Sequence, residues 1–219
     1  TKITVTARIR SDDGKIVSEE NFPIEIHPRY PFPGLDKQQI GILDPVGDTG
    51  KILRQLGVAF KEVKTAGDAM NLDVLIVGRG ALSAGSDPIL SEIEKSGAID
   101  KGLDVLIFEQ KECNFMNLIF QEERQRRIFV RQPSHPFLEG LDNDDLHDWR
   151  GISDFVVDFD KPNISRDERS PLYPHFKYTC GASGIAASYV IRKPQIGNAR
   201  AILDCGFDLL NSPLIEVNK

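Results

Sequence analysis

The hydrophobic pattern of the chain is most regular at Leu72–Gly80, which reads LDVLIVGRG. Branched apolar residues fill positions 74–77 without interruption, and this run is too short for a buried helix. Such a run is typical of a strand covered on both faces, because neither face meets water. Gly78 and Gly80, on either side of Arg79, predict a sharp turn where the strand ends.

The same strand pattern returns at Leu103–Phe108. Between the two strands the sequence predicts a helix, with Ser86 or Asp87 as its N-cap. Pro88 would occupy its first position and Gly97 would end it. Its apolar stripe consists of Ile89, Leu90 and Ile93. A strand, a helix and a strand at this spacing predict a parallel sheet with a right-handed crossover.

Two shorter strands are predicted upstream, at Ile40–Leu43 and Phe60–Val63. Between them, the polar loop Asp44–Thr49 leads into a helix at 50–57, for which Thr49 is the predicted cap. The expected apolar stripe of this helix is Ile52, Leu53 and Leu56. Free N–H groups at the start of a helix attract anions. The loop matches neither of the two common glycine motifs for nucleotides, so the sequence favours a simple turn over a nucleotide site.

Residues 1–28 follow a different pattern, in which apolar and polar residues alternate. Asp12-Asp13-Gly14 is a hairpin signal between two such strands. Two strands cannot form a core alone, and this pair looks like the last hairpin of an immunoglobulin-like β-sandwich. A proline-rich linker follows, so we place a domain boundary after residue 34, between 1–34 and 35–219. Because the chain starts inside a strand pattern, we expect it to be a piece of a longer protein.

After the strand at 103–108, the sequence predicts a helix over about 109–127. One face of this helix would carry Phe115, Leu118, Ile119 and Glu122. Arginines at 124, 126 and 127 suit its carboxyl end, where cations are favoured, and are interpreted as a solvated face.

The last third of the chain alternates between irregular stretches and strands. Ile128–Val130 is a predicted strand, and residues 160–183 are a predicted long loop. Gly184–Lys193 and Arg200–Gly206 are predicted closing strands, with Pro213–Val217 as a third.

Composition narrows the class of protein. The chain has 219 residues, 40% of them hydrophobic and 27% charged, as in a soluble globular protein. A net charge of −6 argues against a nucleic-acid partner. The sequence contains no apolar run of membrane-spanning length, so we predict no membrane partner. The cysteines, Cys113, Cys180 and Cys205, are odd in number and lack CxxC spacing, which excludes a disulfide framework and a cysteine zinc site. We predict no metal and no cofactor.

A doubly wound sheet binds ligands at the carboxyl ends of its strands. The candidate ligand-binding residues there are Asp44, Gly47, Asp48, Thr49, Gly78, Arg79, Gly80, Glu109 and Gln110. Trp149 and Arg150 are added because an indole beside a guanidinium suits sugar stacking or a domain contact. The alternative for this pair is a packed anchor for the following loop.

Several segments together resemble a known family. They are LDVLIVGRGAL at 72–82, GLDVLIFEQ at 102–110, HPFLEGL at 135–141, DWRG at 148–151 and the stretch 189–217. They are similar to the flavodoxin-like, class I glutamine amidotransferase-like domain that occurs in large bacterial proteins of the glycoside hydrolase family 2-like group. They are also similar to the β-galactosidase trimerisation domain. The resemblance implies an α/β, doubly wound, mainly parallel sheet, preceded by the hairpin remnant of a β-sandwich. It also implies that the catalytic acids lie in a separate barrel domain.

In that family, the active members carry a cysteine on a tight elbow after a strand. Here the segment reads F-E-Q-K-E-C, so Glu109 or Gln110 holds the elbow and Cys113 comes about three residues late, inside the predicted helix. His135 is the best available base, but Phe137 follows where the family has a carboxylate, and Glu139 is the nearest substitute. We therefore predict no catalytic residue.

The leading hypothesis is an accessory domain of a multidomain carbohydrate-active enzyme, for assembly, domain packing or glycan contact. Its partners would be other domains of the same chain, carbohydrate, or a second copy. One alternative is an active hydrolase or amidase that uses Cys113, His135 and Glu139. Another alternative is a small-ligand module at 44–49, and a third is a glycosidase pair of Glu109 with Glu112 or Asp44. The compartment stays open, and it is extracytoplasmic if the parent is a secreted glycosidase.

Overall fold

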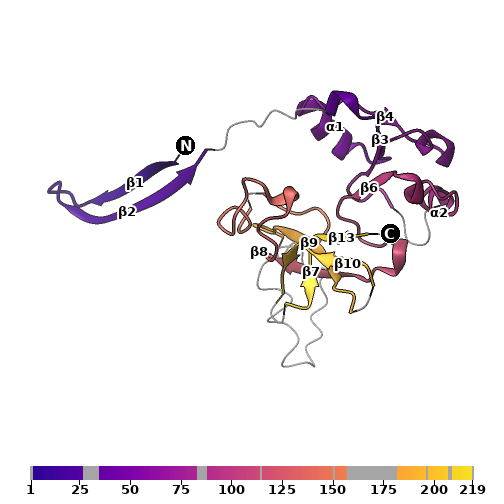
Figure 1. Ribbon diagram of the computed structural model, residues 1–219. Coiled ribbons are helices and arrows are strands. Elements are labelled where there is room, and N and C mark those ends of the chain that lie inside the picture. Colours follow the sequence, from indigo (N-terminus) through magenta and orange to yellow (C-terminus); the bar gives the residue numbers. More distant parts are fainter. Residues whose placement is uncertain are drawn as a thin grey trace, which may run out of the picture. The chain divides into compact units, whose positions relative to one another are not determined.

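The computed structural model (Figure 1) divides the chain into two compact units, Thr1–Leu35 and Asp36–Lys219. The expected boundary, after residue 34, differs from this division by one residue. The structure describes residues 2–26, 35–82, 88–113, 115–149, 151–156, 182–195, 197–206 and 209–218. Five predictions fall outside these ranges: the proline-rich linker at 28–34, the caps Ser86 and Asp87, Arg150, Cys180 and nearly all of the loop at 160–183.

The first unit is the predicted hairpin. Strand β1 (Lys2–Arg10) pairs antiparallel with β2 (Ile16–Glu25), with Val5 opposite Phe22. The turn between them closes with a 2.9 Å hydrogen bond from Ser11 N to Lys15 O. Every described side chain of the ribbon is exposed, including the apolar positions of its alternating face. The ribbon therefore has no core of its own, as expected for two strands.

The second unit contains a four-stranded parallel sheet in the spatial order β4-β3-β5-β6. Its strands are β3 (Ile40–Leu43), β4 (Lys61–Glu62), β5 (Val74–Val77) and β6 (Asp104–Ile107). The run predicted as a buried strand is the central strand β5, and the parallel pairing was correctly predicted. The fold is thus a mixed α/β fold that combines a parallel sheet with the antiparallel sheets described below.

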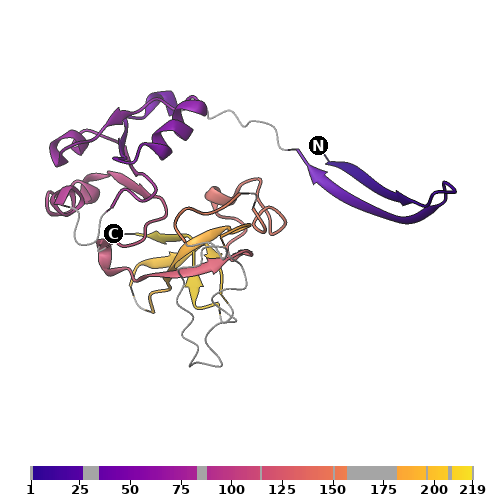
Figure 2. The same ribbon diagram turned by 180° about the vertical axis from the view of Figure 1, so that it is seen from behind.

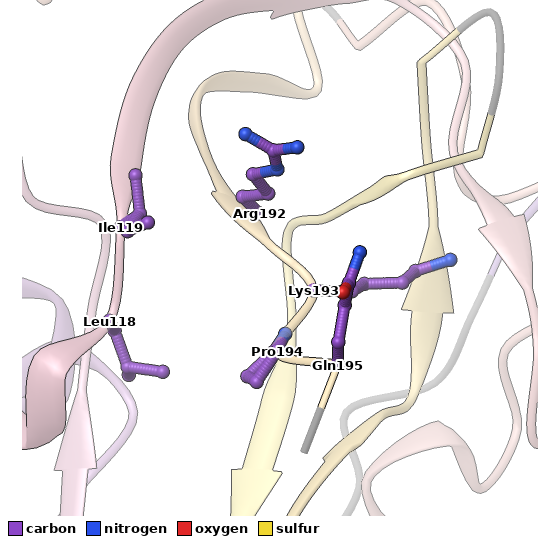
Figure 3. A pocket seen from close by; sticks show the side chains of 6 residues that line it. All are labelled: Leu118, Ile119, Arg192, Lys193, Pro194 and Gln195. Carbon is purple, nitrogen blue, oxygen red and sulfur yellow. The ribbon is translucent and has the colours of Figure 1, made fainter.

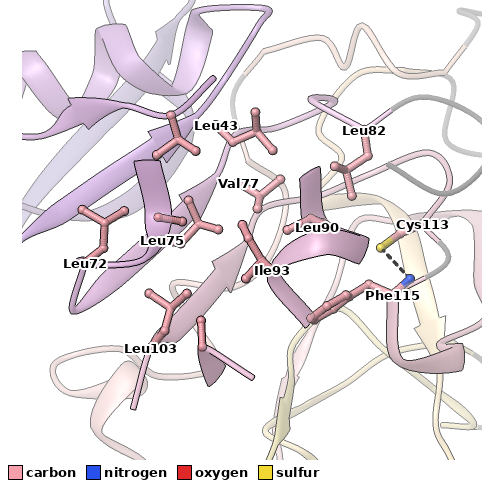
Figure 4. Packing of buried hydrophobic residues seen from close by; sticks show 13 residues of the cluster. Leu43, Leu72, Leu75, Val77, Leu82, Leu90, Ile93, Leu103, Cys113 and Phe115 are labelled. Carbon is pink, nitrogen blue, oxygen red and sulfur yellow. Dashed lines mark hydrogen bonds between the residues drawn. The ribbon is translucent and has the colours of Figure 1, made fainter. Parts of the chain in front are cut away.

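Two helices connect these strands, α1 (Asp48–Gln55) and α2 (Pro88–Lys95). Helix α2 has the predicted apolar stripe, and its fully buried Ile93 packs with Leu75 and Val77 of β5 in the core shown in Figure 4. Gly97 follows this helix in a left-handed conformation, as predicted for a helix end. Short 3₁₀ turns complete this part: η1 (Leu35–Lys37), η2 (Ala66–Ala69) and η3 (Ile99–Lys101).

Helix α1 departs from the prediction. Its N-cap is Gly47 and not Thr49, which lies within the first turn. The expected apolar stripe is also wrong, because Ile52 is 57% exposed while Thr49 and Gly50 are buried. Because Thr49 and Gly50 are small, α1 can approach the strand ends closely. There the carboxylate of Asp44 accepts a hydrogen bond from Gly50 N in the first turn of the helix.

The rest of the second unit consists of short antiparallel strands, coloured pink to yellow in Figure 1 and seen from behind in Figure 2. One sheet has the order β12-β9-β7, formed by β7 (Phe120–Gln125), β9 (Ala187–Arg192) and β12 (Asn211–Ser212). Two pairs accompany it: β8 (Phe129–Val130) with β11 (Leu203–Asp204), and β10 (Ala199–Ala201) with β13 (Ile215–Val217). The closing strands were therefore predicted, but they do not extend the parallel sheet.

The helix predicted at 109–127 is wrong. The chain forms a 3₁₀ turn, η4 (Phe115–Asn117), in which Met116 has a positive φ of 55°, and then enters β7. Because Gln121 and Glu122 pair with β9, long-range sheet pairing overrides the local helical pattern. The arginines are not a solvated helix end: the side chain of Arg124 is only 9% exposed beside Glu122, and Arg126 pairs with Asp148 at 2.9 Å.

A second apolar core lies among these strands and includes Ile128, Leu138, Val190 and Ile202. Leu138 belongs to the last 3₁₀ turn, η5 (Pro136–Leu138). None of the helices among the described residues is long and apolar enough to cross a membrane.

Two isoleucines in the two helices provide a matched test of this packing. Ile93→Ala removes a fully buried side chain from the first core and should lower the free energy of unfolding by about 2–5 kcal/mol. Ile52→Ala removes an exposed side chain and should cost less than about 1 kcal/mol. Urea denaturation measures both, and equal costs would contradict the assignment of the buried face of α1.

Candidate functional site at the carboxyl edge of the parallel sheet

The loops after β3, β5 and β6 lie at one edge of the sheet, because parallel strands end on the same side. Three backbone bonds connect this edge: Gly78 N donates to Leu43 O at 2.9 Å, Phe108 N to Val77 O at 3.0 Å, and Gly80 N to Glu109 O at 3.0 Å. The structure thus brings together the three loops that supplied most of the predicted ligand-binding residues.

Asp44 occupies the start of helix α1. Its carboxylate accepts hydrogen bonds from Gly47 N at 3.0 Å and from Gly50 N at 2.7 Å. An anion bound to α1 would need these N–H groups. The carboxylate also lies against the next loop, since a Cβ atom on Gly78 would be 2.4 Å from Asp44 Oδ1. The protein's own carboxylate therefore takes the position of an anionic ligand.

Thr49 joins the first loop to the second. Its hydroxyl accepts a 2.9 Å hydrogen bond from Arg79 N. Asp48, the neighbouring candidate, is exposed and forms only a surface ion pair with Lys51 at 2.9 Å. Thr49 is therefore a connector between loops, and Asp48 contributes to the surface of α1.

Arg79 is the most heavily engaged of the predicted residues. Its Nε lies 2.9 Å from Glu109 Oε2, and its Nη1 lies 2.6 Å from Asp154 Oδ1. The guanidinium carbon is 3.7 Å from the centre of the Phe155 ring, a stacked cation–π contact. Burial lowers the pKa of Arg79, but the hydrogen bonds to Asp154 and Glu109 outweigh it and raise the pKa. The hydrogen bond from Arg79 lowers the pKa of Asp154.

Glu109 carries this network into the antiparallel part of the unit. Its Oε1 accepts hydrogen bonds from Ser188 N at 2.6 Å and from Tyr189 N at 2.9 Å, both in β9. With Oε2 on Arg79, both carboxylate oxygens have protein partners. Glu109 therefore links the parallel sheet to β9, and this engagement argues against its use in a glycosidase pair with Asp44 or with the exposed Glu112.

Gln110 occupies the elbow position and is fully buried. Its Nε2 donates to Gly78 O and Phe108 O, each at 2.7 Å, and its Oε1 accepts from Leu82 N at 3.0 Å. All of these partners are backbone groups in the segments that follow β5 and β6. The side chain thus satisfies the backbone of both loops.

The alternative catalytic residues have separate surroundings. Cys113 is 6% exposed, belongs to the first core, and its Sγ accepts from Phe115 N at 3.4 Å (Figure 4). It precedes η4 and does not lie inside a helix, which corrects the prediction. His135 is buried against β13: its Nδ1 accepts from Phe137 N at 3.3 Å and its Nε2 is 3.6 Å from Glu216 Oε1. Glu139 is exposed.

Trp149 lies outside the three loops. Its side chain is 48% exposed, and its Nε1 donates a 2.8 Å hydrogen bond to Asp145 O. The indole is therefore held through its Nε1 atom, and part of its ring surface is open to another molecule. Its predicted companion, Arg150, lies outside the described residues.

Sequence reasoning missed Asp154, Phe155 and the β9 amides. They are 75 to 80 positions away from their partners Arg79 and Glu109, so no local spacing connects them. The sequence offered one signal, the glycine at position 80, and the structure shows why it is needed. Its φ is 65°, and a Cβ atom there would lie 2.9 Å from Phe155 Cζ, so this glycine marks the close approach of an aromatic ring.

A separate hollow of about 290 Å³ lies where β9 ends, lined by Leu118, Ile119, Arg192, Lys193, Pro194 and Gln195 (Figure 3). The ammonium of Lys193 already pairs with Asp204 and donates to Leu209 O. Among the described residues, no group of three or more His, Cys, Asp and Glu side chains could hold a metal ion.

Comparisons of the chain with models of protein families, with curated proteins and with solved structures give no match. The functional reading therefore depends on the residues at the site.

Gln110→Leu tests the role of the buried amide. Leucine has a similar size but leaves Gly78 O, Phe108 O and Leu82 N without this partner, so the free energy of unfolding should fall by about 3 kcal/mol or more. Gln55→Leu, at the exposed end of α1, is the control and should change it by less than about 0.5 kcal/mol. Urea denaturation with similar values for the two variants would refute the proposed role.

Asp154→Asn tests the Arg79 network through its pH dependence. Because the folded-state pKa of Asp154 lies below its usual 3.8, the carboxylate stabilises the folded chain above that pH. This contribution is lost as the pH falls through the lowered pKa. Near pH 7 the variant should be less stable than the natural chain, by less than about 1 kcal/mol because Asp154 is largely exposed. The difference should vanish once the pH lies below the lowered pKa of Asp154, and a difference that does not depend on pH would count against the ion pair.

Proposed function

We propose that residues 36–219 form a non-catalytic accessory domain of a multidomain, glycoside hydrolase-like protein, for assembly, domain packing or glycan contact. The observation that carries the proposal is the environment of Gln110. At the elbow where the resemblance places a nucleophile, the side chain is a buried amide bound to three backbone groups. A side chain in this position stabilises the loops and has no free atom for chemistry.

The flavodoxin-like, doubly wound arrangement is part of the proposal. Numbered along the chain, the four parallel strands have the order 2-1-3-4. Flavodoxin-like sheets have this order over their first four strands, which supports the assignment. The resemblance to class I glutamine amidotransferase-like domains concerns the same sheet and its elbow.

The ribbon of β1 and β2 supports a place beside other domains. Its alternating face exposes Ile3, Val5, Ile9, Phe22 and Ile24. A two-stranded ribbon is marginal in water unless such a face is covered. The proposal therefore includes the assignment of the ribbon as the last hairpin of an immunoglobulin-like β-sandwich in the parent chain.

Glycan contact would involve Trp149, whose ring is half exposed and oriented by its bond to Asp145 O. Aromatic rings of this kind provide an apolar surface with a fixed polar end. The catalytic alternative has weaker support, because the contacts of Cys113 lie in the first core and those of His135 lie against β13.

Hydrolysis assays separate the two functions. The 219-residue chain should release no ammonia from glutamine and no nitrophenol from nitrophenyl glycosides, and Cys113→Ser and His135→Ala should behave identically. Turnover by the natural chain that disappears in either variant would contradict the accessory role. Retention of the chain on a glycan array that is lost in Trp149→Ala and kept in Trp149→Phe would identify glycan contact as the role.

A further inference from the structure

A groove of about 630 Å³ lies beside the carboxyl ends of β3 and β4. Its volume falls within the range of small-molecule sites in proteins. The groove is formed mainly by residues that follow these two strands and by one side of α1. It does not include Arg79, Glu109 or Gln110, so the network that closes the elbow leaves it open.

The inner surface of the groove is apolar. Ile42, Leu43 and Val63 line it but are only 2–6% exposed, so its apolar surface that meets water comes from the partly exposed lining residues Phe60, Ala81 and Ile89. Phe60 adds an aromatic wall, and its Cζ would lie 3.5 Å from a Cβ atom built on Gly50. A flat or aliphatic body could pack on this surface and remove it from water.

The rim carries cations that converge on one point. Arg54 Nη2 is 3.7 Å from Glu62 Oε1, and Lys64 Nζ is 3.5 Å from Glu62 Oε2. Both separations exceed the 2.7–2.9 Å or so of a strong charge-assisted hydrogen bond. A single carboxylate therefore sits loosely between two cations and can be displaced by the acidic group of a ligand.

The charge of the rim differs in sign from that of the chain. The lining of the groove contains Lys51, Arg54 and Lys64 but only two carboxylates, Asp44 and Glu62. Asp44 is already bound by Gly47 N and Gly50 N. Lys51 is paired with Asp48 at 2.9 Å, so the excess of one positive charge lies at the rim, where Arg54 and Lys64 face the single carboxylate of Glu62.

We infer that this groove binds a small amphipathic anion, with an apolar ring or chain and a single carboxylate or phosphate. The body of the ligand lies on Phe60, Ala81 and Ile89. Its acidic group takes the place of Glu62 between Arg54 and Lys64. This site goes beyond the accessory role proposed above and does not require a glycan.

NMR titration of the ¹⁵N-labelled chain tests the site with three probes. Naphthalene-2-carboxylate has both the ring and the charge, naphthalene-2-carboxamide has only the ring, and inorganic phosphate has only the charge. The carboxylate should shift the amide signals of Gly47, Lys51 and Lys64 in a saturable way. It should bind at least about tenfold more tightly than either other probe, because the carboxamide lacks the charge-assisted hydrogen bond and phosphate lacks the apolar ring, and each accounts for such a factor.

Charge variants then identify the residues. Arg54→Gln should weaken binding of the carboxylate at least about fivefold, whereas Glu62→Gln should strengthen it by removing the competing carboxylate. Lys95→Gln, at the exposed carboxyl end of α2, is the matched control and should leave binding unchanged. The amide spectrum of each variant reports that it is folded. The inference is overturned by the absence of saturable shifts at the groove, by equal binding of the carboxamide, or by weaker binding in Glu62→Gln.

Discussion

The hydrogen bonds of the Gln110 side chain are the constraint on which the second unit depends. Where parallel strands stop, their last backbone groups need partners, and a ligand-binding fold leaves some of them for the ligand. Here one buried amide binds Gly78 O, Phe108 O and Leu82 N, and so fixes the loops after β5 and β6 together. The carboxyl edge is stable without a ligand because the chain supplies these partners itself.

The same edge also joins the two halves of the unit. Glu109 accepts from the amides of Ser188 and Tyr189 in β9, while Arg79 connects Glu109 to Asp154 and stacks on Phe155. Groups that would face a ligand in an enzyme of this architecture thus face another part of the same domain. Two surfaces remain available: the groove beside the ends of β3 and β4, which this network does not line, and the exposed ring of Trp149.

Local pattern was enough to predict the parallel sheet, since β5 is a buried apolar run, β6 is a partly buried one, and a helix with clear end signals separates them. It failed at 109–127, where the helical spacing of Phe115, Leu118 and Ile119 competes with pairing between β7 and β9 across about 70 residues of chain. It also misjudged α1, whose buried face is set by the contact of Asp44 with Gly50 and not by its apolar residues. The loops of the candidate site were predicted from strand order, but their internal partners depend on tertiary contacts that no spacing encodes.

Amide hydrogen exchange at the carboxyl edge is the most direct test of this closure. Four amides donate to Asp44, Glu109 or Gln110, namely those of Gly50, Gly80, Leu82 and Ser188. They should exchange as slowly as amides within β5, although only Ser188 lies in a strand. Exchange at the rate of an exposed loop in the chain without ligand would contradict the account, because it would mean that the chain does not itself supply lasting partners for these amides.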